Sequence, residues 1–98
     1  VVEELNIIPL GKGSNVSQYL VPALKELKKL KIKHQITPMC TIFEAKNIDE
    51  AFNIVKTAHR AVFKTGVQRV VTTLRLDDRR DIEKTMAEKV YSLTKKME

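Results

Sequence analysis

Polar side chains interrupt the apolar segments of this chain where strands are expected. They carry hydroxyl, amide, carboxylate and guanidinium groups, and they are Asn6, Gln35, Thr37, Thr41, Glu44, Thr72, Thr73 and Arg75. Because buried polar groups must be paired, such residues either bond across an interface or line a cavity. A cavity with apolar walls and a few aimed polar groups suits a small heteroaromatic ligand.

A short turn gathers the first candidate binding residues. Thr37 and Thr41 flank this turn, and Met39 lies between them. Threonine favours strands, so ordinary hairpin chemistry explains both threonines equally well. Glu44 ends the following apolar segment and is the first choice for a carboxylate that hydrogen-bonds a ligand. The alternative for Glu44 is an exposed residue at a strand end.

A dense charge cluster, Asp77–Asp81, follows the last predicted strand. Asp78 is suited to cap the next helix, and Arg79 or Arg80 to pair with Asp81. In the functional alternative, Asp78 meets a positively charged ligand and Arg79 meets a phosphate or an acidic neighbour. Both alternatives stay open at this point.

Ser17 and Tyr19 follow the loop Gly11-Lys12-Gly13-Ser14, and their hydroxyl groups are candidates for ligand contacts. The alternatives are helix capping for Ser17 and core packing for Tyr19. The loop lacks the spacing of a phosphate-binding loop. No nucleophile and base, and no set of metal ligands, can be assembled from the sequence, so we predict no catalytic residues, no metal and no cofactor.

The periodicity of apolar residues predicts strands over 2–10, 32–37, 41–45 and 69–76, with helices between and after them. Asn47 with Glu50 forms a capping box for the second helix. The apolar seam predicted for this helix is Ile48, Phe52, Val55, His59 and Val62. The order β-α-β-β-α-β-α predicts an α+β fold in one domain, residues 1–98. It is a ferredoxin-like βαββαβ sandwich with an antiparallel four-stranded sheet and an extra C-terminal helix.

The predicted strands carry apolar residues on both faces. Leu5 and Ile7 point to one side, and Ile8 and Leu10 to the other. Two crossover helices cover only one face of such a sheet. We therefore expect the open face to pack on another subunit of a homo-oligomer.

The net charge of +6, from 18 basic and 12 acidic residues, raises the question of nucleic-acid binding. Many lysines alternate with glutamates, however, and Phe43 is the only aromatic residue in a predicted strand, whereas RNA-binding sheets need several. We predict no nucleic-acid partner. No apolar run approaches the roughly 20 residues of a membrane span. With a single cysteine, Cys40, and no signal segment at Val1, we expect a cytoplasmic protein without membrane contact.

Three segments, IPLGKGS (8–14), TPMCTIFEA (37–45) and RVVTTLRLDDRRD (69–81), resemble those of the thiamine-binding protein family in order and spacing. The resemblance covers nearly the whole chain. It implies a non-enzymatic protein that binds thiamine or its hydroxymethylpyrimidine part for carriage, salvage or sensing. It also implies homodimers that can pair into homotetramers. The family commonly has glycine where Cys40 stands, so we expect extra bulk at that turn.

With the resemblance, the predicted ligand-binding residues are Ser17, Tyr19, Thr37, Met39, Thr41, Glu44, Asp78 and Arg79. The alternative function is an oligomeric scaffold, or an enzyme of unspecified reaction, with no thiamine-related ligand. Fold alone does not choose between these possibilities.

Overall fold

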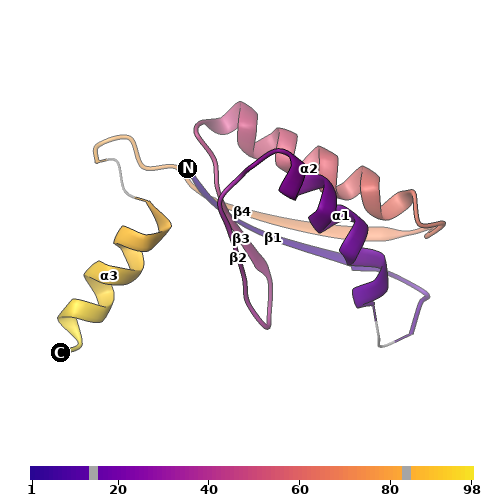
Figure 1. Ribbon diagram of the computed structural model, residues 1–98, viewed down its shortest axis with the longest axis horizontal. Helices are drawn as coiled ribbons and strands as arrows, with labels where there is room; N and C mark the ends of the chain where they lie inside the picture. Colours follow the sequence, from indigo (N-terminus) through magenta and orange to yellow (C-terminus); the bar gives the residue numbers. More distant parts are fainter. Residues whose placement is uncertain (14–15, 83–84) are drawn as a thin grey trace.

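A four-stranded antiparallel sheet with the strand order β2-β3-β1-β4 organises the chain (Figure 1). The computed structural model describes residues 1–13, 16–82 and 85–98. Its elements are β1 (Val2–Pro9), α1 (Ser17–Lys29), β2 (His34–Ile36), β3 (Thr41–Glu44), α2 (Ile48–Phe63), β4 (Val70–Asp77) and α3 (Met86–Lys96). This order confirms the predicted α+β, ferredoxin-like plan with an additional C-terminal helix.

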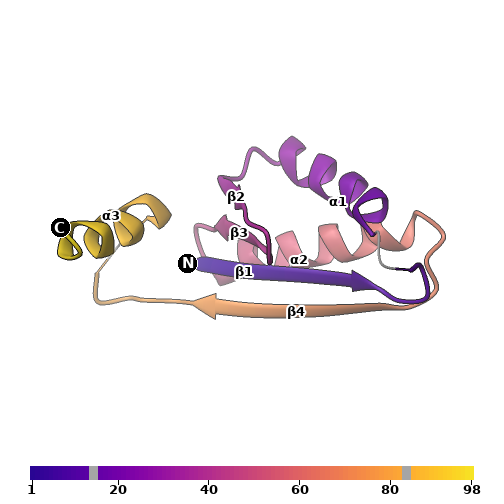
Figure 2. The same ribbon diagram turned by 90° about the horizontal axis from the view of Figure 1, so that it is seen from below.

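The strand register decides which residues face the helices. β1 pairs with β4 from Val2↔Asp77 to Pro9↔Val70, and with β3 from Val2↔Glu44 to Leu5↔Thr41. Since side chains alternate along a strand, Leu5 and Ile7 enter the core under α1 and α2, whereas Ile8 lies on the opposite face. Both helices lie on one side of the sheet (Figure 2), so the other face is open.

Alanines form much of the α2 surface that faces the core. The buried residues of α2 are Ala51, Ile54, Ala58, Ala61 and Val62. The predicted seam was therefore wrong in part: Val62 is buried, but Phe52 is 47% exposed. Bulky residues dominate a hydrophobic pattern, whereas the short alanines that allow close helix packing contribute little to it. The predicted cap at Asn47 is confirmed, because the Glu50 N–H donates to Asn47 Oδ1 at 2.8 Å. The reciprocal bond of a capping box is not formed, since the Glu50 carboxylate accepts from the Lys46 N–H at 3.1 Å and not from that of Asn47.

Helix α3 lies apart from the sandwich in both views (Figures 1 and 2). It begins after Thr85, whose hydroxyl accepts a hydrogen bond from the Glu88 N–H at 3.1 Å. The expected capping of this helix by Asp78 was therefore wrong. No described residue of α3 is buried, and its apolar residues Val90 and Leu93 are 57% and 64% exposed. None of the helices in the described ranges is long and apolar enough to cross a membrane.

A carboxyl group is buried in the core. Glu3 is fully buried on the helix-facing side of β1, with Phe43 and Leu76 as its neighbours across the register. Neither of its carboxyl oxygens has a hydrogen-bond partner among the described residues. Burial disfavours the charged form and raises the pKa of Glu3 to about 7. The core therefore holds a group that is largely protonated below neutral pH.

This burial predicts a pH-dependent stability. The Glu3 carboxyl ionises near its ordinary pKa of 4.5 in the unfolded chain but only near 7 in the folded protein. The free energy of unfolding should therefore fall as the pH rises from 4.5 through 7. Glu3→Met should remove this slope and stabilise the protein at pH 8 by on the order of 2 kcal/mol. Urea denaturation at pH 5 to 8 measures both effects.

Glu4→Gln is the matched control, because Glu4 is the next residue of β1 and lies exposed on the open face. It should keep the wild-type slope. A Glu3→Met protein with an unchanged slope would contradict the assignment of the titration to Glu3.

Candidate functional site

A cleft of about 300 Å³ lies between helix α1, the edge of β1 and the turn that joins β2 to β3. Leu20 and Leu24 of α1 form one wall, and Phe43 of β3 lies in another. Ile36 and Met39 also line the cleft, and at 64% and 82% exposed they stand at its solvent side. None of its described lining residues carries a charge. The cleft therefore suits a small, largely apolar ring system.

The cleft exists because β3 is shorter than β1. Pairing between these strands stops at Leu5↔Thr41, whereas β1 continues beside β4 to Pro9. Beside the residues of β1 that follow Leu5, the chain forms the turn 37–40 and does not extend β3. This leaves a notch in the sheet, roofed by α1 and closed at its end by the turn.

Thr37 holds the turn together. Its hydroxyl donates to the Cys40 carbonyl at 2.9 Å and accepts from the N–H groups of Cys40 at 3.1 Å and Met39 at 3.3 Å. The Thr37 N–H donates to the same carbonyl at 2.9 Å. The hydroxyl proton and both lone pairs are thus occupied within the turn. Thr37 lines the cleft, but its hydroxyl serves the turn.

Thr41 sits at the other end of the turn. Its side chain is half-buried, it lines the cleft, and its hydroxyl has no hydrogen-bond partner in the part of the chain that the structure describes. Cys40 also lines the cleft, and its Sγ lies 3.5 Å from Thr37 Oγ1. The Cys40 side chain, which was expected to add bulk at this turn, therefore borders the cleft.

The structure divides the eight predicted ligand-binding residues into two groups. Ser17, Thr37, Met39 and Thr41 line the cleft. Tyr19, Glu44, Asp78 and Arg79 do not. Tyr19 is half-buried, with Lys12 Nζ 5.9 Å from the centre of its ring.

Glu44 borders a different hollow, of about 630 Å³, near the starts of α2 and α3. Lys31, Lys33, Lys46, Glu50 and Glu88 also line it. Charges of both signs are thus mixed there with the apolar residues Val1, Leu30, Ile32 and Ala45, whereas no charged residue is among the described lining residues of the cleft.

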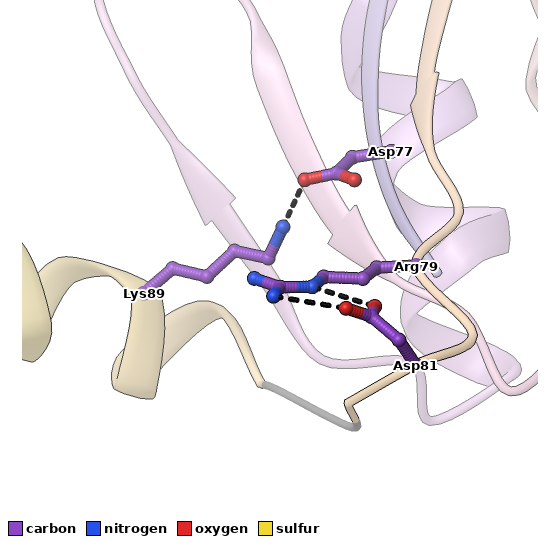
Figure 3. Close-up of polar contacts among 4 residues, drawn as sticks. All are labelled: Asp77, Arg79, Asp81 and Lys89. Atoms are coloured by element: carbon purple, nitrogen blue, oxygen red, sulfur yellow. Dashed lines mark hydrogen bonds and ion pairs between the residues drawn. The ribbon is translucent and has the colours of Figure 1, made fainter.

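Asp78 and Arg79 lie exposed beyond the end of β4. Figure 3 shows Arg79 beside Asp81, and Asp77 beside Lys89. Arg79 pairs with Asp81 through two bonds, Nε to Oδ1 at 2.7 Å and Nη2 to Oδ2 at 3.1 Å, which confirms one predicted pairing. Arg80 Nη2 bonds Asp78 Oδ2 at 3.0 Å, and this bond lowers the pKa of Asp78 below its usual 3.8. Lys89 of α3 contacts Asp77. The charged side chains of this cluster are therefore paired with one another and with Lys89.

The cleft also contains residues outside the predicted set. They are chiefly Asn6 and Ile7 of β1, together with the apolar residues of α1. Asn6 belongs to the polar strand residues noted in the sequence, whereas Ile7 reads as an ordinary core residue. Only the unequal lengths of β1 and β3 reveal that both border a cleft. No group of three or more His, Cys, Asp or Glu side chains is placed to hold a metal ion within the described ranges.

Comparison with known proteins identifies the family. The model of the thiamine-binding protein family matches residues 3–94. The chain belongs to the thiamine-binding protein family. A relative in this family, the UPF0045 protein of Methanothermobacter thermautotrophicus, is 43% identical over 98 residues, covering 99% of each chain. The UPF0045 protein YqgV of Bacillus subtilis is 35% identical over 102 residues, covering 99% of this chain and 97% of its own.

Solved structures share the fold. A crystal structure of a hypothetical protein from Methanocaldococcus jannaschii superposes with a TM-score of 0.87 at 39% identity, covering 96% of this chain and 95% of the other. A candidate thiamine biosynthesis/salvage protein from Thermotoga maritima gives a TM-score of 0.78 at 20% identity, covering 94% and 96%. At that identity the second likeness concerns the fold alone.

The bonds of Thr37 predict a structural role that stability measurements can test. Thr37→Val removes one donor and one acceptor that serve three hydrogen bonds and leaves backbone groups of the turn unpaired. We expect it to lower the free energy of unfolding by about 1–3 kcal/mol. Thr41→Val, the matched control at the other end of the turn, should change it by less than about 0.5 kcal/mol. Equal effects of the two changes in urea denaturation would refute the distinction.

Proposed function

We propose that this protein binds thiamine or its hydroxymethylpyrimidine part in the cleft between α1 and the β2–β3 turn, one ligand per subunit. The role is carriage, salvage or sensing of the compound. The observation that carries the proposal is an uncharged cleft of about 300 Å³ with apolar walls, in a chain that belongs to the thiamine-binding family.

The chemistry of the cleft favours one orientation of thiamine. Leucine side chains of α1 and the ring of Phe43 provide apolar surface for the faces of the pyrimidine ring. The Thr41 hydroxyl is available to its polar edge. No charged residue among those described lines the cleft, so burying the thiazolium cation there would be costly. The pyrimidine end therefore enters, and the thiazolium stays near Met39 and solvent.

We also propose that the open face of the sheet is covered by a second copy in a homodimer, which can pair into a homotetramer. Ile8 and Val71 oppose each other in the register of β1 and β4, and they are 42% and 43% exposed on that face. Neighbouring exposed apolar residues of this kind commonly mark an interface. Sedimentation velocity that shows only monomer at micromolar concentration would contradict this part of the proposal.

Two substitutions test where thiamine binds. Thr41→Val removes the available hydroxyl of the cleft and should weaken binding about fivefold to tenfold, as expected for one neutral hydrogen bond. Glu44→Gln alters the other hollow and should leave the affinity within about twofold of wild type. Calorimetric titration of refolded, ligand-free protein with thiamine, hydroxymethylpyrimidine and thiamine diphosphate measures both.

The reverse pattern, a loss with Glu44→Gln and none with Thr41→Val, would move the site to the hollow beside α2. Absence of binding by the wild-type protein up to millimolar concentration would refute the proposed ligand.

A further inference from the structure

Three consecutive residues of β1, Leu5, Asn6 and Ile7, line the cleft. Side chains alternate along a strand, so the Asn6 side chain points to the opposite face from those of Leu5 and Ile7. What these residues share on the cleft side is the backbone edge of the strand. The cleft thus has a wall made of main-chain atoms.

The hydrogen-bonding pattern shows which main-chain groups face the cleft. The Val1 amino group donates to the Ala45 carbonyl at 3.0 Å, and the Ala45 N–H donates to the Val1 carbonyl at 2.8 Å. In an antiparallel ladder every second residue repeats this arrangement, so Glu3 and Leu5 also direct their N–H and C=O groups toward β3. Ile7 is the next residue in that series.

Ile7 has no strand beside it on this side, because the pairing with β3 ends at Leu5↔Thr41. It does not use β4 instead. The Leu10 N–H donates to the Arg69 carbonyl at 2.9 Å, which shows that the even-numbered residues of β1 bond β4. Within the described residues, the Ile7 N–H and C=O therefore point side by side into the cleft without a strand partner. Backbone groups in such a place require a partner.

We propose that this pair of groups recognises the aminopyrimidine ring. The Ile7 N–H donates to the ring nitrogen beside the amino group, and the amino group donates to the Ile7 carbonyl. The ring thus occupies the hydrogen-bonding position beside β1 that lies past the end of its pairing with β3, as an added strand does at an open sheet edge. This inference rests on the proposed function, and it names the ligand class: heteroaromatic rings with an amino group next to an acceptor nitrogen.

The same geometry predicts discrimination between pyrimidines. A ring without the amino group leaves the Ile7 carbonyl unpaired, and a 4-oxo ring places an acceptor against that carbonyl. A site built to hydrogen-bond a group rejects analogues that lack it, because its own polar groups are then left unpaired. We expect the deamino analogue of hydroxymethylpyrimidine to bind at least about tenfold more weakly.

Ile7→Pro tests the donor directly. Proline has no N–H, and at this position the missing group faces the cleft and not β4. Pro9, two residues further along the same edge, shows that this side of β1 accommodates a proline. Ile7→Val is the matched control, since it keeps the N–H while it trims the side chain. A synthetic chain joined at Cys40, with the α-hydroxy acid of isoleucine at position 7, removes the N–H and keeps the side chain.

The experiment is calorimetric titration of the wild-type, Val, Pro and ester forms with hydroxymethylpyrimidine and its deamino analogue, after circular dichroism has established folding. We expect wild type and Ile7→Val to agree within about threefold, and the Pro and ester forms to bind the amino compound at least about tenfold more weakly. If the Pro form does not fold, the ester form decides.

Two results overturn the inference in distinguishable ways. Equal binding of the amino compound by wild type and the ester form would remove the Ile7 N–H from recognition and overturn the proposed pair of contacts, while thiamine binding stays intact. No binding of either pyrimidine or of thiamine by the wild-type protein would refute the proposed function together with the inference.

Discussion

The unequal pairing of β1 is the constraint on which the rest of this molecule depends. This strand is paired with β4 along all eight of its residues, but with β3 only from Val2 to Leu5. A longer β3 would have closed the sheet and covered the main chain of Ile7. Because the Thr37 hydroxyl closes a tight turn instead, the sheet keeps a notch beneath α1. The early end of β3 thus determines both the shape of the sheet and the position of the candidate site.

The packing around the notch explains why it remains open. Alanines at Ala23 of α1 and Ala58 of α2 are almost fully buried, and both also border the cleft. Short side chains allow the helices to lie close to the sheet and to each other, yet they do not reach far enough to fill the space past the end of β3. The buried Glu3 lies four residues before Ile7 on the same face of β1, so the core contains a polar group as well as a cleft.

The sequence predicted the features that depend on local chemistry. The strands β1 and β4, the helix cap at Asn47 and the order of elements are all present in the structure. The face of α2 was misread because alanine gives a weak hydrophobic signal. The burial of Glu3 was missed because a carboxylate in an alternating strand reads as exposed. Four of the eight site residues line the cleft. Glu44 is the last residue of β3, and Asp78 and Arg79 follow β4, so these three lie at the other end of the sheet. A recognition edge made of backbone has no residue type by which a sequence could reveal it.

The most direct measurement is a titration of ¹⁵N-labelled protein with thiamine, followed by the amide resonances. Binding in the notch predicts the largest shift changes at the amides of Ile7, Met39 and Thr41, with little change at Lys46 and Glu50. Changes concentrated at Lys46 and Glu50, with the Ile7 and Thr41 amides unaffected, would contradict a site at the edge of β1.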